Sequence, residues 1–149
     1  RGISGDAVMT AARAEIAWED RRVPEAGRLA DEVISSRNVE PATRAGALHV
    51  KVQMLIERRD LDKAVPLLEE LTRLRRNPVD WALLGHCHSQ TGKTTEAIAA
   101  FEKVLTIAPG QGAIHQALAP LYQRAGDDDL ARKHRTQGRR LPPGGFRPR

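Results

Sequence analysis

The most informative part of this 149-residue chain is residues 78–111, which read PVDWALLGHCHSQTGKTTEAIAAFEKVLTIAPGQ. Trp81, Leu84 and His88 recur at spacings of three and four, so they share one face of a helix. Gly92 follows that face at the position where helices commonly end in a left-handed residue. The first half of the stretch therefore predicts one helix that ends in a tight turn.

The second half of the stretch predicts another helix. Thr94 or Thr95 is expected to cap its N-terminus, because a threonine oxygen can accept a bond from an unpaired amide there. Pro109 follows it and stops it. Its apolar face consists of Ala97, Ile98, Phe101, Val104 and Leu105. Gly85 on the first helix leaves room for close approach, so we expect an antiparallel helix pair.

The spacing of these residues resembles the tetratricopeptide repeat, which has a period of about 34 residues. His88 stands where the motif has tyrosine. The same frame fits once downstream and twice upstream with less specific residues. They are Leu118, Ala119, Tyr122, Gly126 and Ala131; Leu48, Val52, Leu55, Asp60, Ala64, Leu68 and Leu71; and Ala14, Ala17, Ala26, Ala30 and Val33. The resemblance implies an all-α fold, a right-handed α-solenoid of three to four antiparallel helix pairs.

We expect eight helices within a repeat domain that covers residues 7–140. Their ranges are about 7–20, 24–37, 44–58, 61–74, 78–91, 94–107, 112–125 and 128–140, in units of about 7–40, 44–77, 78–111 and 112–140. Pro66 and Pro120 fall inside two of these helices and are expected to kink or shorten them. Residues 141–149 are rich in Pro, Gly and Arg and are expected to form a tail or linker.

Composition and charge exclude several classes of protein. Aromatic residues make up only 3% of the chain, which disfavours aromatic-rich barrels and base-stacking RNA platforms. No apolar run approaches the roughly 18 to 20 residues of a membrane span. The net charge of +5 equals that of residues 124–149 alone, which hold eight basic and three acidic groups. We therefore expect no membrane span and no nucleic-acid partner.

The chain shows no pattern typical of catalysis, of a metal site or of cofactor binding. The Gly-Lys-Thr at 92–94 resembles half of a phosphate-binding loop, but Cys87 stands where that motif needs its first glycine. The His-Cys-His at 86–88 cannot converge on one metal ion, because adjacent helical side chains point about 100° apart. Cys87 is interpreted as a packing residue that forms no internal disulfide. We expect a non-catalytic protein without a cofactor. A lone thiol and no export signal favour the cytoplasm, with the periplasm as the alternative.

Function is therefore expected to reside in the surface. The resemblance implies a concave groove, lined by the first helix of each pair, that binds a protein or peptide segment. The expected partner-binding residues are Trp18, His49, Gln53, Ile56, His86, Ser89, Gln90, Gln116, Gln123 and Arg124. Trp18 could instead cover the end of the solenoid. The carboxylate clamp of chaperone adaptors is excluded, because its positions hold Ala11, Glu15, Val50, Ala113 and Ala117.

Two further functions stay open from the sequence. The chain could be the repeat region of a larger enzyme, of transferase or hydroxylase type, that positions substrate or drives oligomerisation. It could also self-associate through the apolar ends of the solenoid. The basic segment from residue 124 could be a solvated capping helix, could dock an acidic partner or a neighbouring domain of the same protein, or could touch nucleic acid or an anionic membrane surface. Its cations are expected to be spread around the helix without a stripe.

Overall fold

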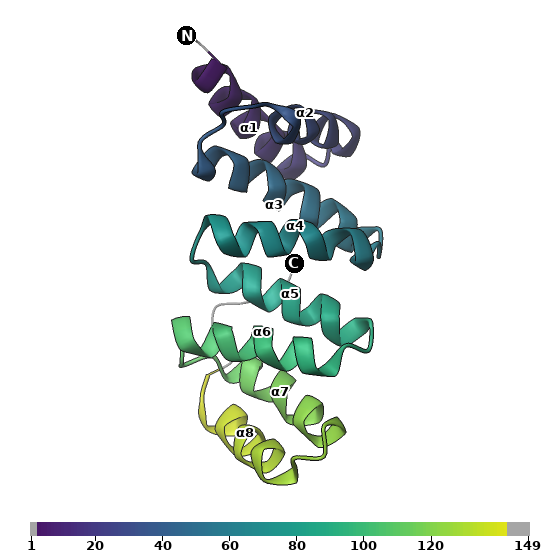
Figure 1. The fold of residues 1–149 in the computed structure, drawn as a ribbon, viewed down its shortest axis with the longest axis vertical. Helices are drawn as coiled ribbons and strands as arrows, with labels where there is room; N and C mark the ends of the chain where they lie inside the picture. The colour runs from purple at the N-terminus through teal and green to yellow at the C-terminus, as the bar shows by residue number, and fades with distance from the viewer. Residues whose placement is uncertain (1–2, 143–149) are drawn as a thin grey trace. The chain divides into compact units, whose positions relative to one another are not determined.

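The computed structural model describes the backbone of residues 3–142, and within that range it contains eight helices and no strands. The helices are α1 (Ile3–Glu19), α2 (Val23–Ser35), α3 (Pro41–Glu57), α4 (Leu61–Leu74), α5 (Pro78–Gln90), α6 (Thr94–Ile107), α7 (Gly112–Arg124) and α8 (Asp128–Arg140). The helices fold back on one another as the antiparallel pairs α1–α2, α3–α4, α5–α6 and α7–α8 (Figure 1). The predicted all-α class is confirmed. Most of the predicted tail, residues 143–149, lies outside the described range.

The chain divides into two compact units, Arg1–Arg75 and Arg76–Arg149. In the first unit α1, α2 and α3 pack on one another and α4 packs on α3. In the second unit α6 packs on both α5 and α7, and α7 packs on α8. The first core contains Ala11, Ala14, Ala17, Ala26, Leu29, Ala30, Val33, Ala47, Val50 and Met54. The second contains Ala82, Ala97, Phe101, Val104, Ile114, Leu118 and Leu121. Small side chains dominate the first core, so its helices can approach closely.

The turn inside each helix pair has the same backbone geometry. It contains one left-handed residue: Arg21 (φ 61°), Arg59 (φ 60°), Gly92 (φ 78°) and Gly126 (φ 85°). In every case the next amide donates to a carbonyl five residues earlier, at 2.8–2.9 Å. This bond defines the Schellman ending of a helix, which satisfies a carbonyl that would otherwise be unpaired. The predicted role of Gly92 is confirmed.

The N-terminal ends of the helices agree less well with the predictions from the sequence. Lys93 is the N-cap of α6, with no side-chain cap, so the expectation that Thr94 or Thr95 caps it is wrong. Asp127 does cap α8, because its carboxylate accepts a bond from the Leu130 amide at 3.0 Å. Helix α3 begins at Pro41, three residues earlier than predicted, since proline suits the first turn of a helix.

The two internal prolines do not shorten their helices. Pro66 lies inside α4, which continues to Leu74, and Pro120 lies inside α7, which continues to Arg124. Both prolines are exposed to solvent. A carbonyl that loses its helical partner on that side can bond to water, which makes the proline tolerable there.

Gly85 of α5 packs directly against the ring of Phe101 on α6. A Cβ atom at this position would stand 2.9 Å from both Cδ1 and Cε1 of Phe101. The predicted reason for a glycine here is therefore confirmed.

Candidate functional site

In the first unit, the side chain of Trp18 lies between the core and the solvent. Its indole is partly buried and packs against the apolar core of α1, α2 and α3. The guanidinium carbon of Arg21 lies 5.0 Å from the centroid of the Trp18 ring, within the range of a cation–π contact. The tryptophan is therefore less exposed than the sequence suggested, and one ring face is covered by Arg21.

The guanidinium of Arg21 is held in place by Glu57 at the end of α3. Nη1 of Arg21 donates to Oε1 of Glu57 and Nη2 donates to Oε2, both at 3.0 Å. The hydrogen bond from Arg21 lowers the pKa of Glu57, and the same bond raises the pKa of Arg21. Both groups are exposed, so their attraction adds little stability. Its geometric effect is larger, because the paired bonds fix the arginine over Trp18.

The first helices of the two pairs in this unit, α1 and α3, pack side by side. Glu15 of α1 reaches across to α3, where a Cβ atom on Gly46 would lie 2.6 Å from the glutamate Oε1. His49, Gln53 and Ile56 of α3 are all partly exposed. Ala11, which the repeat frame assigned to the groove, is only 5% exposed and belongs to the core.

The predicted residues of the second unit fall into two sets. His86 and Gln90 are exposed on α5 and Ser89 is partly exposed. On α7, Gln116 donates from Nε2 to the Gly138 carbonyl at 3.0 Å. The others on α7 are Gln123, which accepts a long bond of 3.5 Å from Arg135, and the exposed Arg124. Gln116 and Gln123 therefore contact α8.

A partly buried polar cluster, which the sequence did not reveal, joins α6, α7 and α8 around the buried His134. Nδ1 of His115 lies 2.8 Å from Nδ1 of His134, and Nε2 of His134 lies 3.3 Å from Oε1 of Glu102. The Tyr122 hydroxyl donates to the same Glu102 oxygen at 2.8 Å, and its ring stacks on His134. One signal was available: Ala131, His134 and Gly138 form the only buried line of α8, at helical spacing.

The surroundings of the cluster favour the uncharged forms of the His134 imidazole and the Tyr122 phenol. Burial is the main reason that the pKa of His134 is lowered, with Glu102 opposing the shift and His115 and Lys133 adding to it. Burial and then Glu102 raise the pKa of Tyr122 to about 12. Both ring nitrogens of His134 face protein groups, so the cluster leaves it no open position for a substrate.

Two further residues whose side chains could take part in chemistry, Cys87 and His88, are also buried. Cys87 is fully buried, as its interpretation as a packing residue predicted, and burial raises the pKa of its thiol to about 11. His88 is buried beside it on α5. Over the residues that the structure describes, no group of three His, Cys, Asp or Glu side chains is arranged to hold a metal ion.

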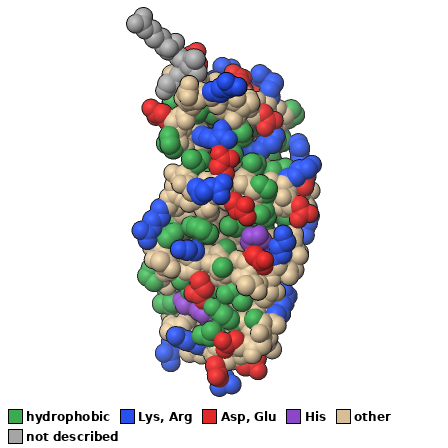
Figure 2. Space-filling view, in the orientation of Figure 1, with side chains coloured by type: hydrophobic (Ala, Val, Ile, Leu, Met, Phe, Trp, Pro, Cys, Tyr) green, Lys and Arg blue, Asp and Glu red, His purple; other side chains and the backbone are tan. Residues whose placement is uncertain are grey.

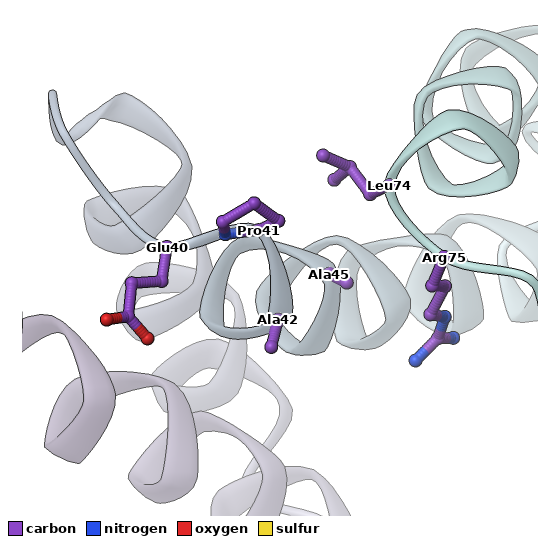
Figure 3. A pocket seen from close by; sticks show the side chains of 6 residues that line it. All are labelled: Glu40, Pro41, Ala42, Ala45, Leu74 and Arg75. Carbon is purple, nitrogen blue, oxygen red and sulfur yellow. The ribbon is translucent and has the colours of Figure 1, made fainter.

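A shallow pocket of about 460 Å³ lies in the first unit, between the start of α3 and the end of α4 (Figure 3). Its lining is Glu40, Pro41, Ala42, Ala45, Leu74 and Arg75. The carboxylate and the guanidinium stand at opposite ends of the pocket (Figure 3). They do not converge on a common point, so the pocket lacks the paired groups that acid–base catalysis requires.

Residues 81–111 match the sequence model of the tetratricopeptide repeat. The chain carries a tetratricopeptide repeat. The match spans most of α5 and α6, including Gly85, Gly92 and Phe101, so the predicted resemblance is confirmed. No curated protein matches the sequence.

The tetratricopeptide fold extends over nearly all of the chain. A MamA double mutant labelled RS-1 ArsTM matches with a TM-score of 0.77 and 20% identity, over 91% of this chain and 75% of the other. MamA of AMB-1 matches with a TM-score of 0.77 and 21% identity, over 92% of this chain and 73% of the other. A MamA structure from Desulfovibrio magneticus RS-1, starting at residue 41, matches with a TM-score of 0.72 and 20% identity, over 89% of this chain and 73% of the other. At such low identity these likenesses establish a shared fold and nothing more.

The charged side chains give no single-sign patch on the face that Figure 2 draws. On the face shown in Figure 2, acidic and basic side chains are interspersed. In the range 3–142 no helix is long and apolar enough to cross a membrane. The repeat and the fold are typical of protein-interaction scaffolds.

Proposed function

We propose that this chain is a non-catalytic scaffold that binds a protein or peptide segment along the first helices of its helix pairs. The strongest candidate surface is the one shared by α1 and α3 in the first unit. It comprises Trp18, His49, Gln53 and Ile56, with Glu15 beside them. The observation that carries the proposal is the half-buried Trp18 under an arginine that Glu57 holds in place.

A tryptophan held in this way is a good anchor for a partner. Trp and Arg dominate the residues that contribute most to protein interfaces. Because the core and Arg21 already restrict the Trp18 ring, little side-chain entropy remains to be lost on binding. Gln53 and His49 can bond to the backbone of a bound segment, and exposed Glu15 and Glu19 favour a segment that carries Lys or Arg.

The second unit offers a separate surface, which we assign to the same function. His86, Ser89 and Gln90 line the outer side of α5, within the tetratricopeptide repeat itself. Gln116, Gln123 and Arg124 lie on α7, and we propose that they extend the binding surface near α8.

The two surfaces can be tested separately by affinity capture from a lysate, followed by titration calorimetry with the captured partner. Trp18→Ala and Gln53→Arg alter the first surface, and His86→Glu alters the second. Ala99→Arg, on the exposed side of α6, is a control that adds the same charge as Gln53→Arg. We expect Trp18→Ala and Gln53→Arg to lose binding of the captured partner and Ala99→Arg to retain it. Wild-type affinity in all the variants would contradict the proposal.

Self-association is a second candidate, favoured by the outer side of α1. Val8, Met9 and Ile16 are 44%, 65% and 52% exposed, and they are the exposed large hydrophobic side chains among the described residues. An apolar strip of this kind often marks a contact between proteins. Met9→Glu with Ile16→Glu should abolish any concentration-dependent increase of mass in sedimentation. A wild-type chain that stays monomeric at every concentration would exclude this function.

A further inference from the structure

The solvent-exposed side of helix α8 is rich in cationic side chains. Only Ala131, His134 and Gly138 of this helix are buried, so nearly everything else faces solvent. The exposed cations are Arg132, Lys133, Arg135, Arg139 and Arg140. Three of them, Arg132, Arg135 and Arg139, follow the spacing i, i+3, i+7 and therefore form one line along the helix. The expectation that the cations form no stripe is wrong for these three.

The guanidinium groups of this arginine line have no carboxylate partner in residues 3–142. Two arginines of the first unit, by contrast, are paired with carboxylates: Arg21 with Glu57, and Arg44 with Glu70. Arg135 of this line donates a long bond of 3.5 Å to Oε1 of Gln123, a neutral side chain. Asp128 precedes the line by one helical turn, so the full pattern along this side is one negative charge followed by three positive charges.

The helix that carries the arginine line is firmly anchored. Gln116 of α7 donates to the carbonyl of Gly138, and the buried imidazole of His134 belongs to the polar cluster with His115. Beyond the helix, the amide of Gly112 donates to the carbonyl of Pro142 at 3.0 Å. A Cβ atom at Gly112 would lie 2.5 Å from that oxygen, so the close approach depends on glycine. The three arginines are thus presented on a fixed backbone, which reduces the cost of ordering them in a complex.

We propose that the arginine line docks an acidic helix of a partner protein. At 1.5 Å per residue, the three arginines are spaced by about 4.5 and 6 Å along the axis. A helix with the pattern Glu-x-x-x-Glu-x-x-Glu-x-x-x-Lys, lying antiparallel, sets a glutamate beside each arginine and a lysine beside Asp128. This order also places the partner's acids toward its N-terminus and its lysine toward its C-terminus, which its own macrodipole favours.

Phosphate-bearing partners fit the surface less well. In the part of the chain that the structure describes, the exposed large hydrophobic side chains all belong to α1, so α8 offers none to insert into a bilayer. Helix α8 contains no Phe, Tyr or Trp on which a base could stack. Asp128 and Asp129 at its start would repel a phosphate backbone that continued past the arginines.

The test uses the full chain and a fluorescein-labelled, alanine-based peptide of about 20 residues with this Glu and Lys pattern. A second peptide of equal composition distributes the glutamates around its helix. The test variant is Arg132→Gln, Arg135→Gln and Arg139→Gln together. The control variant is Arg28→Gln, Arg37→Gln and Arg58→Gln, which removes the same charge from exposed positions of the first unit. Circular dichroism checks that both variants keep their helices.

We expect fluorescence anisotropy at low salt to show tighter binding of the patterned peptide than of the scrambled one. Because an exposed ion pair contributes about 0.2–1 kcal/mol, loss of three pairs should weaken binding about tenfold. The control variant should bind like the wild type. A variant with glutamate at all three positions should instead bind a peptide whose glutamates are replaced by lysine.

Equal affinity of the two variants, or of the two peptides, would overturn the proposal. Failure of the charge-reversed pair to bind would also count against it. Duplex DNA and phosphatidylserine vesicles serve as the competing anions. If either binds the same three arginines more tightly than the peptide does, the surface recognises phosphate and the acidic-helix proposal is wrong.

Discussion

Replacing Gly85 by alanine tests the packing on which the tetratricopeptide pair depends. Elsewhere in a helix this change stabilises a protein, by roughly 1 kcal/mol from helix propensity. At Gly85 the new methyl would stand 2.9 Å from two ring atoms of Phe101, whose side chain is only 6% exposed. The best separation of two carbon atoms is about 3.5–4.0 Å, so the ring or the helix must move.

The size of the effect follows from two opposing contributions. Overpacking of a filled core costs typically 1–3 kcal/mol, and the propensity gain offsets roughly 1 kcal/mol of it. We therefore expect Gly85→Ala to lower the free energy of unfolding of the second unit by about 1 kcal/mol. Gly5→Ala is the matched control, because Gly5 lies in α1 and a Cβ there meets no atom within 4 Å. It should be neutral or stabilising.

Urea unfolding followed by tryptophan fluorescence measures this effect in the relevant unit. The chain has two tryptophans, so a Trp18→Phe background leaves Trp81 of α5 as the single reporter for Gly85→Ala, and a Trp81→Phe background leaves Trp18 of α1 as the single reporter for Gly5→Ala. Phe101→Leu in the Gly85→Ala chain should recover part of the loss, because a smaller side chain relieves the clash. If Gly85→Ala and Gly5→Ala change stability equally, or if the double variant shows no coupling, the packing argument is refuted.

Three further predictions concern other parts of the molecule. Arg59→Gly should stabilise the first unit by about 0.5–1 kcal/mol in urea unfolding, because Arg59 adopts φ 60°, where a side chain is strained, and unchanged stability would show that the turn holds no strain. The pKa of His134 is lowered in the folded state, so its contribution to stability is present above the unfolded pKa near 6.5 and is lost as pH falls below that value. Unfolding between pH 7.5 and pH 5 should therefore show a loss that His134→Gln reduces, and an identical slope in that variant would contradict the assignment. The Cys87 thiol, with its pKa near 11, should not react with Ellman's reagent at pH 8 until urea unfolds the chain, whereas rapid labelling of the native protein would show that it is accessible.

Local sequence features predicted the helix pairs well. The Trp81 to Pro109 spacing identified the repeat, and Gly92 and Gly126 marked two of the four turns. Arg21 and Arg59 adopt the same left-handed geometry without being glycine, so composition alone could not reveal those turns. The wrong caps at Thr94 and Thr95 arose because several residues near a helix start can cap it, and only the path of the chain selects among them.

The candidate sites were predicted less completely, because they depend on residues that are distant in the sequence. Trp18 was recognised as a candidate anchor, but its cover by Arg21 and the hold of Glu57 on that arginine require α1 and α3 to lie side by side. Similarly, the spacing of residues 132, 135 and 139 is visible in the sequence. Which side of α8 is buried depends on its packing against α7.

By itself, the sequence determined the all-α class and the helix pairs, because helical periodicity and turn chemistry act over only a few neighbouring residues. Only the tertiary structure decided which side chains meet. Glu102, His115, Tyr122 and His134 come from three helices and form one partly buried cluster. No local rule specifies such a cluster, because its energy depends on distances between helices that the packing of the whole unit sets.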